Sequence, residues 1–200
     1  MGSNDRLNFA VIGLNRRAYA HLSSLKANKS AARISHVCNV DSNILRKFAD
    51  STQKEMGEAA VAEKDFRNIL ERKDMDAITI ATPDHWHAPM AIAGLQAGKH
   101  VYVEKPCSHN PAEGEMLVEA QQKHGKLVQM GTQQRSSPHT IEIVQKINSG
   151  LIGRPYLAKA RYCNLRKSIG TGKEVPVPAQ PSSCHSELGG QTRYPTSLQA

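Results

Sequence analysis

Short apolar runs alternate along the chain with segments whose apolar residues recur every three or four positions. The runs predict strands buried on both faces, as parallel strands are, and the other segments predict amphipathic helices. Strands are expected at 7–12, 33–40, 76–82, 100–103 and 126–131, with one more at 155–163. This alternation predicts an α/β fold with a right-handed, doubly wound parallel sheet.

The expected helices follow the strands and are marked by capping residues and glycines. A short helix is expected at 66–71, and longer ones at 111–124 and 138–149. Asn110 as N-cap, Pro111 in the first position and Glu113 in the third are typical of a helix start. In the last helix, the side expected to be buried is formed by Ile141, Val144 and Ile147.

The composition allows a folded core and excludes several classes of protein. Apolar residues make up 39% of the chain, with no run of about eighteen that could span a membrane. The net charge of +8 is dispersed, with no more than two basic residues in a row, which favours solvated surface over nucleic-acid binding. The first six residues lack a signal-peptide apolar segment, and the four cysteines fit no metal or disulfide spacing. A cytoplasmic protein with reduced thiols is expected.

The turn after the first strand carries an imperfect dinucleotide fingerprint. Gly13 stands at the first glycine of G-x-G-x-x-G, Asn15 at the second, and Ala18 at the third. A helix that begins here offers unpaired N–H groups and a positive dipole end to a pyrophosphate, and Arg16 could reach the same phosphates. An ordinary strand–helix turn explains the same residues equally well.

The end of the second strand offers two candidates for a ribose contact. An acid about 20 residues after the fingerprint holds the ribose in NAD sites, and Asn39 and Asp41 lie near that distance. Alternatively, Asp41 or Ser42 caps the next helix. The two roles are compatible.

The loop after the third strand contains two histidines, His85 and His87. A metal site is not favoured, because residues two apart on a helix do not face each other and no nearby His or Cys completes a ligand set. The loop is expected instead to pack against a cofactor, with His87 on the crevice.

The strand at 100–103 ends at an acid, a lysine and a proline: Glu104, Lys105 and Pro106. Proline must end the strand, and the carboxyl ends of parallel strands face the ligand crevice. Lys105 therefore delivers an ammonium group to the place where chemistry is expected. A surface lysine after a core strand is the alternative.

Four blocks in this order resemble the Gfo/Idh/MocA oxidoreductase family. They are 9–15 (FAVIGLN), 81–88 (ATPDHWHA), 98–106 (GKHVYVEKP) and 130–135 (MGTQQR), and the likeness covers roughly 7–170. The resemblance implies a Rossmann domain that binds NAD or NADP, at 1–134, and a second α/β domain that covers the nicotinamide and a sugar or cyclitol substrate.

The resemblance also implies roles for single residues. Lys105 matches the catalytic lysine, which would hydrogen-bond the hydroxyl whose carbon loses hydride. The residues implied to bind the cofactor are Gly13, Asn15 and Arg16 at the pyrophosphate, Asn39 or Asp41 at the ribose, and Thr82, Pro83, His87 and Glu104 along its length. Asn39 stands where relatives often carry the acid, which leaves NAD versus NADP open.

The chain is much shorter than members of this family. Only the start of a substrate domain is expected, at 135–170, followed by an irregular or disordered tail at 171–200. The chain is interpreted as truncated, which predicts impaired dehydrogenase activity, or a non-catalytic nucleotide-binding fragment. An NAD-dependent glycosidase is a further alternative, although Lys105 argues against it. Some relatives carry an export signal, so a periplasmic location is expected if one was lost. An uncovered sheet edge at 155–163 would favour pairing with a second copy.

Overall fold

The computed structural model describes residues 6–161 of the chain. They divide into two compact units, which meet in sequence between Gly131 and Thr132. No helix within 6–161 is long and apolar enough to cross a membrane. The predicted strand at 155–163 and the predicted tail at 171–200 lie partly or wholly outside the described residues.

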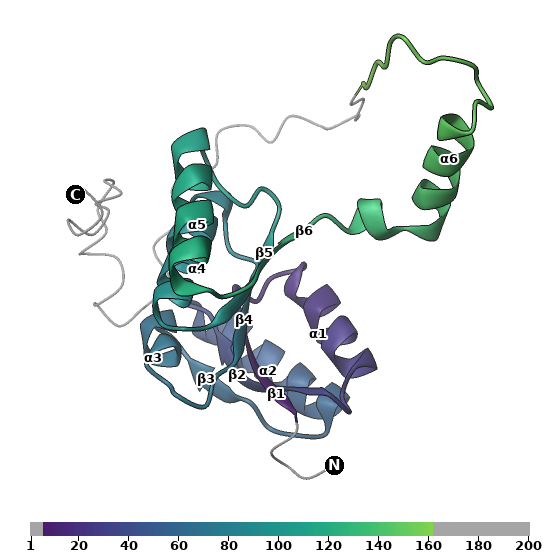
Figure 1. Cartoon of the computed structure of the whole chain (residues 1–200). Coiled ribbons are helices and arrows are strands. Elements are labelled where there is room, and N and C mark those ends of the chain that lie inside the picture. The colour runs from purple at the N-terminus through teal and green to yellow at the C-terminus, as the bar shows by residue number, and fades with distance from the viewer. Residues whose placement is uncertain (1–5, 162–200) are drawn as a thin grey trace, which may run out of the picture. The chain divides into compact units, whose positions relative to one another are not determined.

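The first unit is built on a parallel sheet of six strands in the order β3-β2-β1-β4-β5-β6 (Figure 1). The strands are β1 Leu7–Ile12, β2 Ala32–Cys38, β3 Val61–Glu63, β4 Ala77–Ile80, β5 His100–Glu104 and β6 Val128–Gly131. The predicted doubly wound α/β fold is confirmed. The three-residue β3 was not predicted, because it is mostly exposed and too short to show a period.

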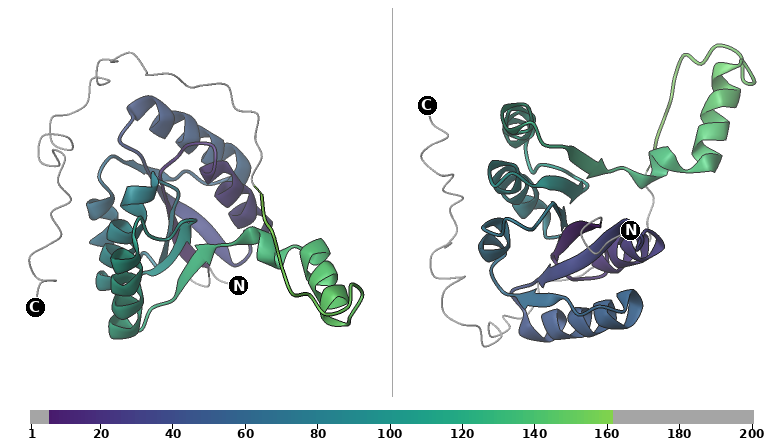
Figure 2. Two further views of the ribbon diagram at one scale, coloured as in Figure 1. Left: turned by 90° about the horizontal axis from the view of Figure 1, so that it is seen from above. Right: turned by 60° about the horizontal axis from the view of Figure 1, so that its bottom comes forward.

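Helices cover both faces of this sheet, as Figure 2 shows. They are α1 Ala18–Ala27, α2 Ser42–Met56, α3 Phe66–Leu70, α4 His87–Gln96 and α5 Pro111–His124. Val11 of β1 packs in one core with Leu22 of α1 and Phe48 of α2, whereas Ile12 packs in the other with Ile69 of α3 and Leu95 of α4. Alternate residues of one strand thus fill two cores, which is why β1 is apolar throughout.

The strand order places β1 at the point where the connections change direction. From β1 the chain moves through β2 to β3, and it then returns to the other side of β1 as β4. Ligands of doubly wound folds bind at such a switch point, beyond the carboxyl ends of the strands. A ligand is therefore expected beside the ends of β1 and β4.

The second unit contains a 3₁₀ turn, Gln133–Ser136, and the helix α6, Pro138–Asn148. Two expectations for this part are wrong. Ile141 and Val144 are 44% and 48% exposed and Ile147 is half-buried, because no element among the described residues of this unit covers their side of α6. Residues 155–161 form no strand, since no strand within 6–161 pairs with them, and the rest of the expected strand lies outside the described residues.

Candidate functional site

Four strands end in register at the carboxyl edge of the sheet. Ile12 at the end of β1 lies opposite both Cys38 of β2 and Ile80 of β4, and Ile80 lies opposite Val103 of β5. The positions that follow these strands therefore come together at one edge, as the sequence predicts. They are Gly13, Asn39, Ala81, Thr82 and Lys105.

Gly13 lets the turn after β1 touch the end of β4. Its φ of +81° is left-handed, a conformation that glycine adopts without strain. A Cβ at this position would lie 2.7 Å from the Ala81 carbonyl atoms and from the Thr82 nitrogen, so any other residue must displace backbone. The Gly13 N–H also donates to the Cys38 carbonyl at 3.0 Å, which fixes the turn to the end of β2.

The first turn of α1 begins without a side-chain cap. Arg17 occupies the N-cap position but does not cap, and the turn contains no acidic residue. The helices α2 and α5, by contrast, are capped by Asp41 and Asn110. Asn15 and Arg16 are exposed beside this turn, and the Arg16 N–H donates to Asn15 Oδ1 at 2.9 Å. An uncapped helix N-terminus next to an arginine fits a phosphate group.

Asn39 and Asp41 form a linked turn after β2. Asn39 Oδ1 accepts a hydrogen bond from the Asp41 N–H at 2.9 Å. The Asp41 carboxylate in turn accepts from the N–H groups of Asn43 at 2.8 Å and Ile44 at 3.2 Å. The capping interpretation of Asp41 is confirmed, and a ribose contact by either residue stays a prediction.

Replacing Asp41 by alanine is expected to lower the free energy of unfolding by about 1 kcal/mol, because two N–H groups of α2 lose their acceptor. Urea denaturation measures the loss. Asp41→Asn, which keeps an acceptor oxygen, is the matched control and should stay within a few tenths of a kcal/mol of the wild type. Equal stability of the alanine variant and the wild type would contradict the capping role.

The loop after β4 is held by His87, whose side chain is only 2% exposed. Its Nδ1 lies 2.5 Å from the Pro106 carbonyl oxygen, and its Nε2 lies 2.9 Å from that of Thr82. The ring thus joins the loop after β4 to the loop after β5. His87 was expected on the crevice, and its side chain is enclosed between these loops. Pro83 is exposed beside it, and the buried Thr82 Oγ1 has no hydrogen-bond partner among the described residues.

Glu104 ends β5 and binds two side chains of α1. Its Oε1 accepts from Arg17 Nε at 2.7 Å and lies 2.8 Å from His21 Nε2. The sequence interpretation assigned Glu104 to the cofactor and overlooked Arg17 and His21. The sequence did offer one signal, because a buried carboxylate requires a positively charged or hydrogen-bonding partner. This rule does not say which residue the partner is.

Burial and pairing set the protonation of this group. Burial lowers the pKa of His21, and this effect exceeds the opposing influence of the Glu104 carboxylate. Burial raises the pKa of Glu104, but the hydrogen bonds from His21 and Arg17 outweigh it and leave the pKa below its ordinary value. Both pKa shifts favour an ionised Glu104 carboxylate that accepts a hydrogen bond from the Nε2–H group of a neutral His21. The ring of His21 also meets Tyr102 edge-on, with centroids 5.3 Å apart.

Lys105 follows directly on this group and is exposed. Its bond to Pro106 is a cis peptide. Among residues 6–161 its ammonium has no hydrogen-bond or ion-pair partner, so it is free to meet a ligand at the carboxyl edge. Its assignment as the catalytic residue stays a prediction.

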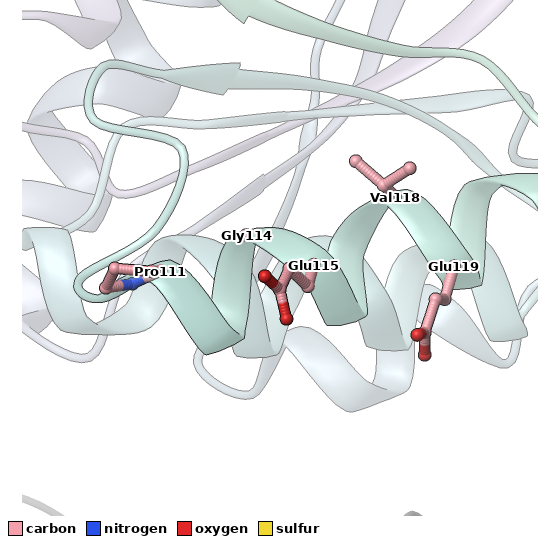
Figure 3. Close-up of a pocket in the computed structure, with 5 residues that line it drawn as sticks. All are labelled: Pro111, Gly114, Glu115, Val118 and Glu119. Carbon is pink, nitrogen blue, oxygen red and sulfur yellow. The ribbon is translucent and has the colours of Figure 1, made fainter.

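Other features of the described residues add no competing site. No group of three or more His, Cys, Asp or Glu side chains within 6–161 is placed to hold a metal ion. Figure 3 shows a hollow along α5, lined by Pro111, Gly114, Glu115, Val118 and Glu119. None of the residues expected to bind cofactor lines it.

The fold and the edge geometry are those of the Rossmann class. The chain belongs to the Gfo/Idh/MocA oxidoreductase family, described as an oxidoreductase family with an NAD-binding Rossmann fold, which residues 7–132 match. A curated relative is the inositol 2-dehydrogenase/D-chiro-inositol 3-dehydrogenase of Shouchella clausii, 31% identical over 79% of this chain and 45% of its own length. A glycosyl hydrolase family 109 protein of Saccharopolyspora erythraea is 26% identical over 97% of this chain and 43% of its own length.

Solved structures agree on the fold. The WlbA dehydrogenase from Bordetella pertussis, crystallised with NADH and UDP-GlcNAcA, superposes with a TM-score of 0.68 at 24% identity. The match covers 74% of this chain and 44% of that one. The chain thus spans about half the length of the relatives that it matches.

Proposed function

We propose that this chain binds a nicotinamide dinucleotide and takes part in hydride transfer to or from a hydroxyl of a sugar or cyclitol. The observation that carries the proposal is the close contact of Gly13 with Ala81 and Thr82 beside the uncapped start of α1. This contact brings the start of α1 to the switch point of the sheet, where a pyrophosphate fits. The family and the inositol dehydrogenase relative support the same function.

Each residue of the edge has a task in this proposal. Gly13, Asn15 and Arg16 hold the pyrophosphate, Asn39 or Asp41 holds the adenosine ribose, and Thr82, Pro83, His87 and Glu104 shape the wall along the cofactor. A bound nicotinamide supplies the hydride chemistry. Lys105 hydrogen-bonds the substrate oxygen through Nζ, stabilises negative charge that develops there, and passes on the hydroxyl proton. Residues 1–134 act as the cofactor domain, and residues 135–170 begin the substrate domain.

Titration of the purified chain with NADH and NADPH, followed by nicotinamide fluorescence, tests the proposal. Saturable binding of both is expected, because the neutral Asn39 amide neither repels nor specifically attracts a 2′-phosphate. Asn39→Asp is the matched variant, and its carboxylate should weaken NADPH about tenfold or more and leave NADH binding intact. Absence of saturable binding by the folded wild type would overturn the proposal.

An NAD-dependent glycosidase is the second candidate, because the glycosyl hydrolase relative matches 97% of the chain. It would use the same dinucleotide edge. Release of nitrophenol from nitrophenyl glycosides in the presence of NAD, without net reduction of the dinucleotide, would favour this candidate over the dehydrogenase. Binding of dinucleotide without either activity would identify a non-catalytic nucleotide-binding chain.

A further inference from the structure

Glu104 joins the end of β5 to the start of α1, two elements that are distant in sequence. Arg17 and Glu104 are separated by 87 residues, and His21 and Glu104 by 83. Arg17 and His21 are four residues apart on α1 and therefore lie on one side of that helix, where both reach the same carboxylate oxygen. A further ion pair of α1, Lys26 with Glu55 at 2.5 Å, joins this helix to α2 and not to a strand end.

Two of the three side chains in this group are enclosed. The side chains of Glu104 and His21 are 10% and 6% exposed, whereas that of Arg17 is 45% exposed. Tyr102, two residues before Glu104, lies on the same face of β5 and contacts the His21 ring. A carboxylate that is shielded from water and accepts two hydrogen bonds holds its partners more firmly than a surface ion pair does.

The first turn of α1, the helix that this group holds, lacks a side-chain cap. Arg17 occupies the N-cap position of α1, so its hydrogen bond to Glu104 connects the first turn of α1 to the end of β5. The Arg17 side chain caps no N–H group and instead ties the turn to the end of β5. The N–H groups of Ala18 and Ala20 already donate to the carbonyls of Asn15 and Arg17, so the tie to β5 fixes the direction of the N–H groups that remain in this turn. Binding of an anion by backbone N–H groups depends on that direction.

We propose that Glu104 is a positioning residue that fixes the start of α1 through Arg17 and His21, so that the turn after Gly13 is preorganised for a pyrophosphate. The inference rests on the proposed dinucleotide binding and changes the role of Glu104 within it. Glu104 acts on the phosphate half of the ligand through α1, and it does not act by contact with the nicotinamide half.

ADP-ribose, which has the pyrophosphate but no nicotinamide, separates these two roles. Glu104→Gln is expected to weaken ADP-ribose and NADH by the same factor, about tenfold, because both ligands use the turn that Glu104 orients. Competition with NADH fluorescence gives both dissociation constants. A loss confined to NADH would overturn the proposal, since only a direct contact with the nicotinamide half produces it.

A double-mutant cycle tests whether the effect passes through α1. Arg17→Met breaks the same contact from its half-exposed side, where folding is least disturbed. Glu104→Gln should weaken ADP-ribose less in the Arg17→Met background than in the wild type, because one of the two contacts of Glu104 with α1 is already lost there. Additive losses in the double variant would overturn the proposal.

Arg6→Met is the matched control, because it removes another partly buried ion pair that joins distant segments, Arg6 with Glu58 at 2.7 Å, before β1 begins. Its ADP-ribose affinity should equal that of the wild type. Wild-type protein that binds neither ADP-ribose nor NADH would refute the proposed function itself. Wild-type binding that Glu104→Gln and Arg17→Met leave unchanged would refute this inference alone.

Discussion

Replacing Gly13 by alanine is expected to lower the free energy of unfolding by about 2–5 kcal/mol, because two costs add at this position. A left-handed φ of +81° costs an alanine about 1–2 kcal/mol. A Cβ at 2.7 Å from the Ala81 and Thr82 backbone forces the ends of β1 and β4 apart, and overpacking of this kind costs about 1–3 kcal/mol. Dinucleotide affinity should fall at least about tenfold, because the displaced turn carries the phosphate-binding N–H groups.

Gly57→Ala separates the two costs. Gly57 ends α2 with the same φ of +81°, but nothing lies within 4 Å of a Cβ added there. Its substitution should lower the free energy of unfolding by only about 1–2 kcal/mol and leave dinucleotide binding unchanged. Urea denaturation of the two variants measures the difference. Equal destabilisation of both would show that the contact between Gly13 and the end of β4 contributes nothing.

Most of the first unit could be predicted from its sequence because its strands are buried on both faces. Burial of this kind leaves an apolar run such as Leu7–Ile12, and capping residues such as Asp41 and Asn110 mark where helices begin. β3 escaped prediction because its three residues are held by backbone pairing with His36–Cys38, and pairing leaves no trace in side-chain pattern. The periodicity of α6 correctly predicted a helix but not burial, which depends on what other segments cover Ile141 and Val144.

The candidate site, like the fold, could be predicted from the sequence only in part. Gly13, Asn39, Thr82 and Lys105 were placed together because topology alone brings the ends of parallel strands to one edge. Side-chain partners across that edge were not predictable, because they depend on where helices settle on the sheet. Glu104 meets Arg17, a residue 87 positions earlier, and no local pattern encodes that pairing.

Lys105 does not belong to the group formed by Glu104, Arg17 and His21. Its substitution is expected to reduce catalysis without reducing cofactor binding. In the proposed reaction, Lys105→Met should lower turnover by about 10²–10⁴-fold, because the substrate oxygen loses both a cationic donor and a route for its proton. The dissociation constant for NADH should change by less than about threefold, since the turn after Gly13 and the Glu104 group are untouched. Turnover is followed as formation of reduced nicotinamide on a panel of cyclitols and sugars.

The matched control is Lys123→Met, which removes another lysine that is exposed in the last turn of α5. It should leave turnover unchanged, because the end of α5 lies outside the carboxyl edge on which Lys105 stands. A Lys105→Met variant with turnover within about threefold of the wild type would remove Lys105 from the reaction. A parallel loss of NADH affinity would instead make Lys105 a cofactor-binding residue, because a group needed only in the transition state does not change ground-state binding.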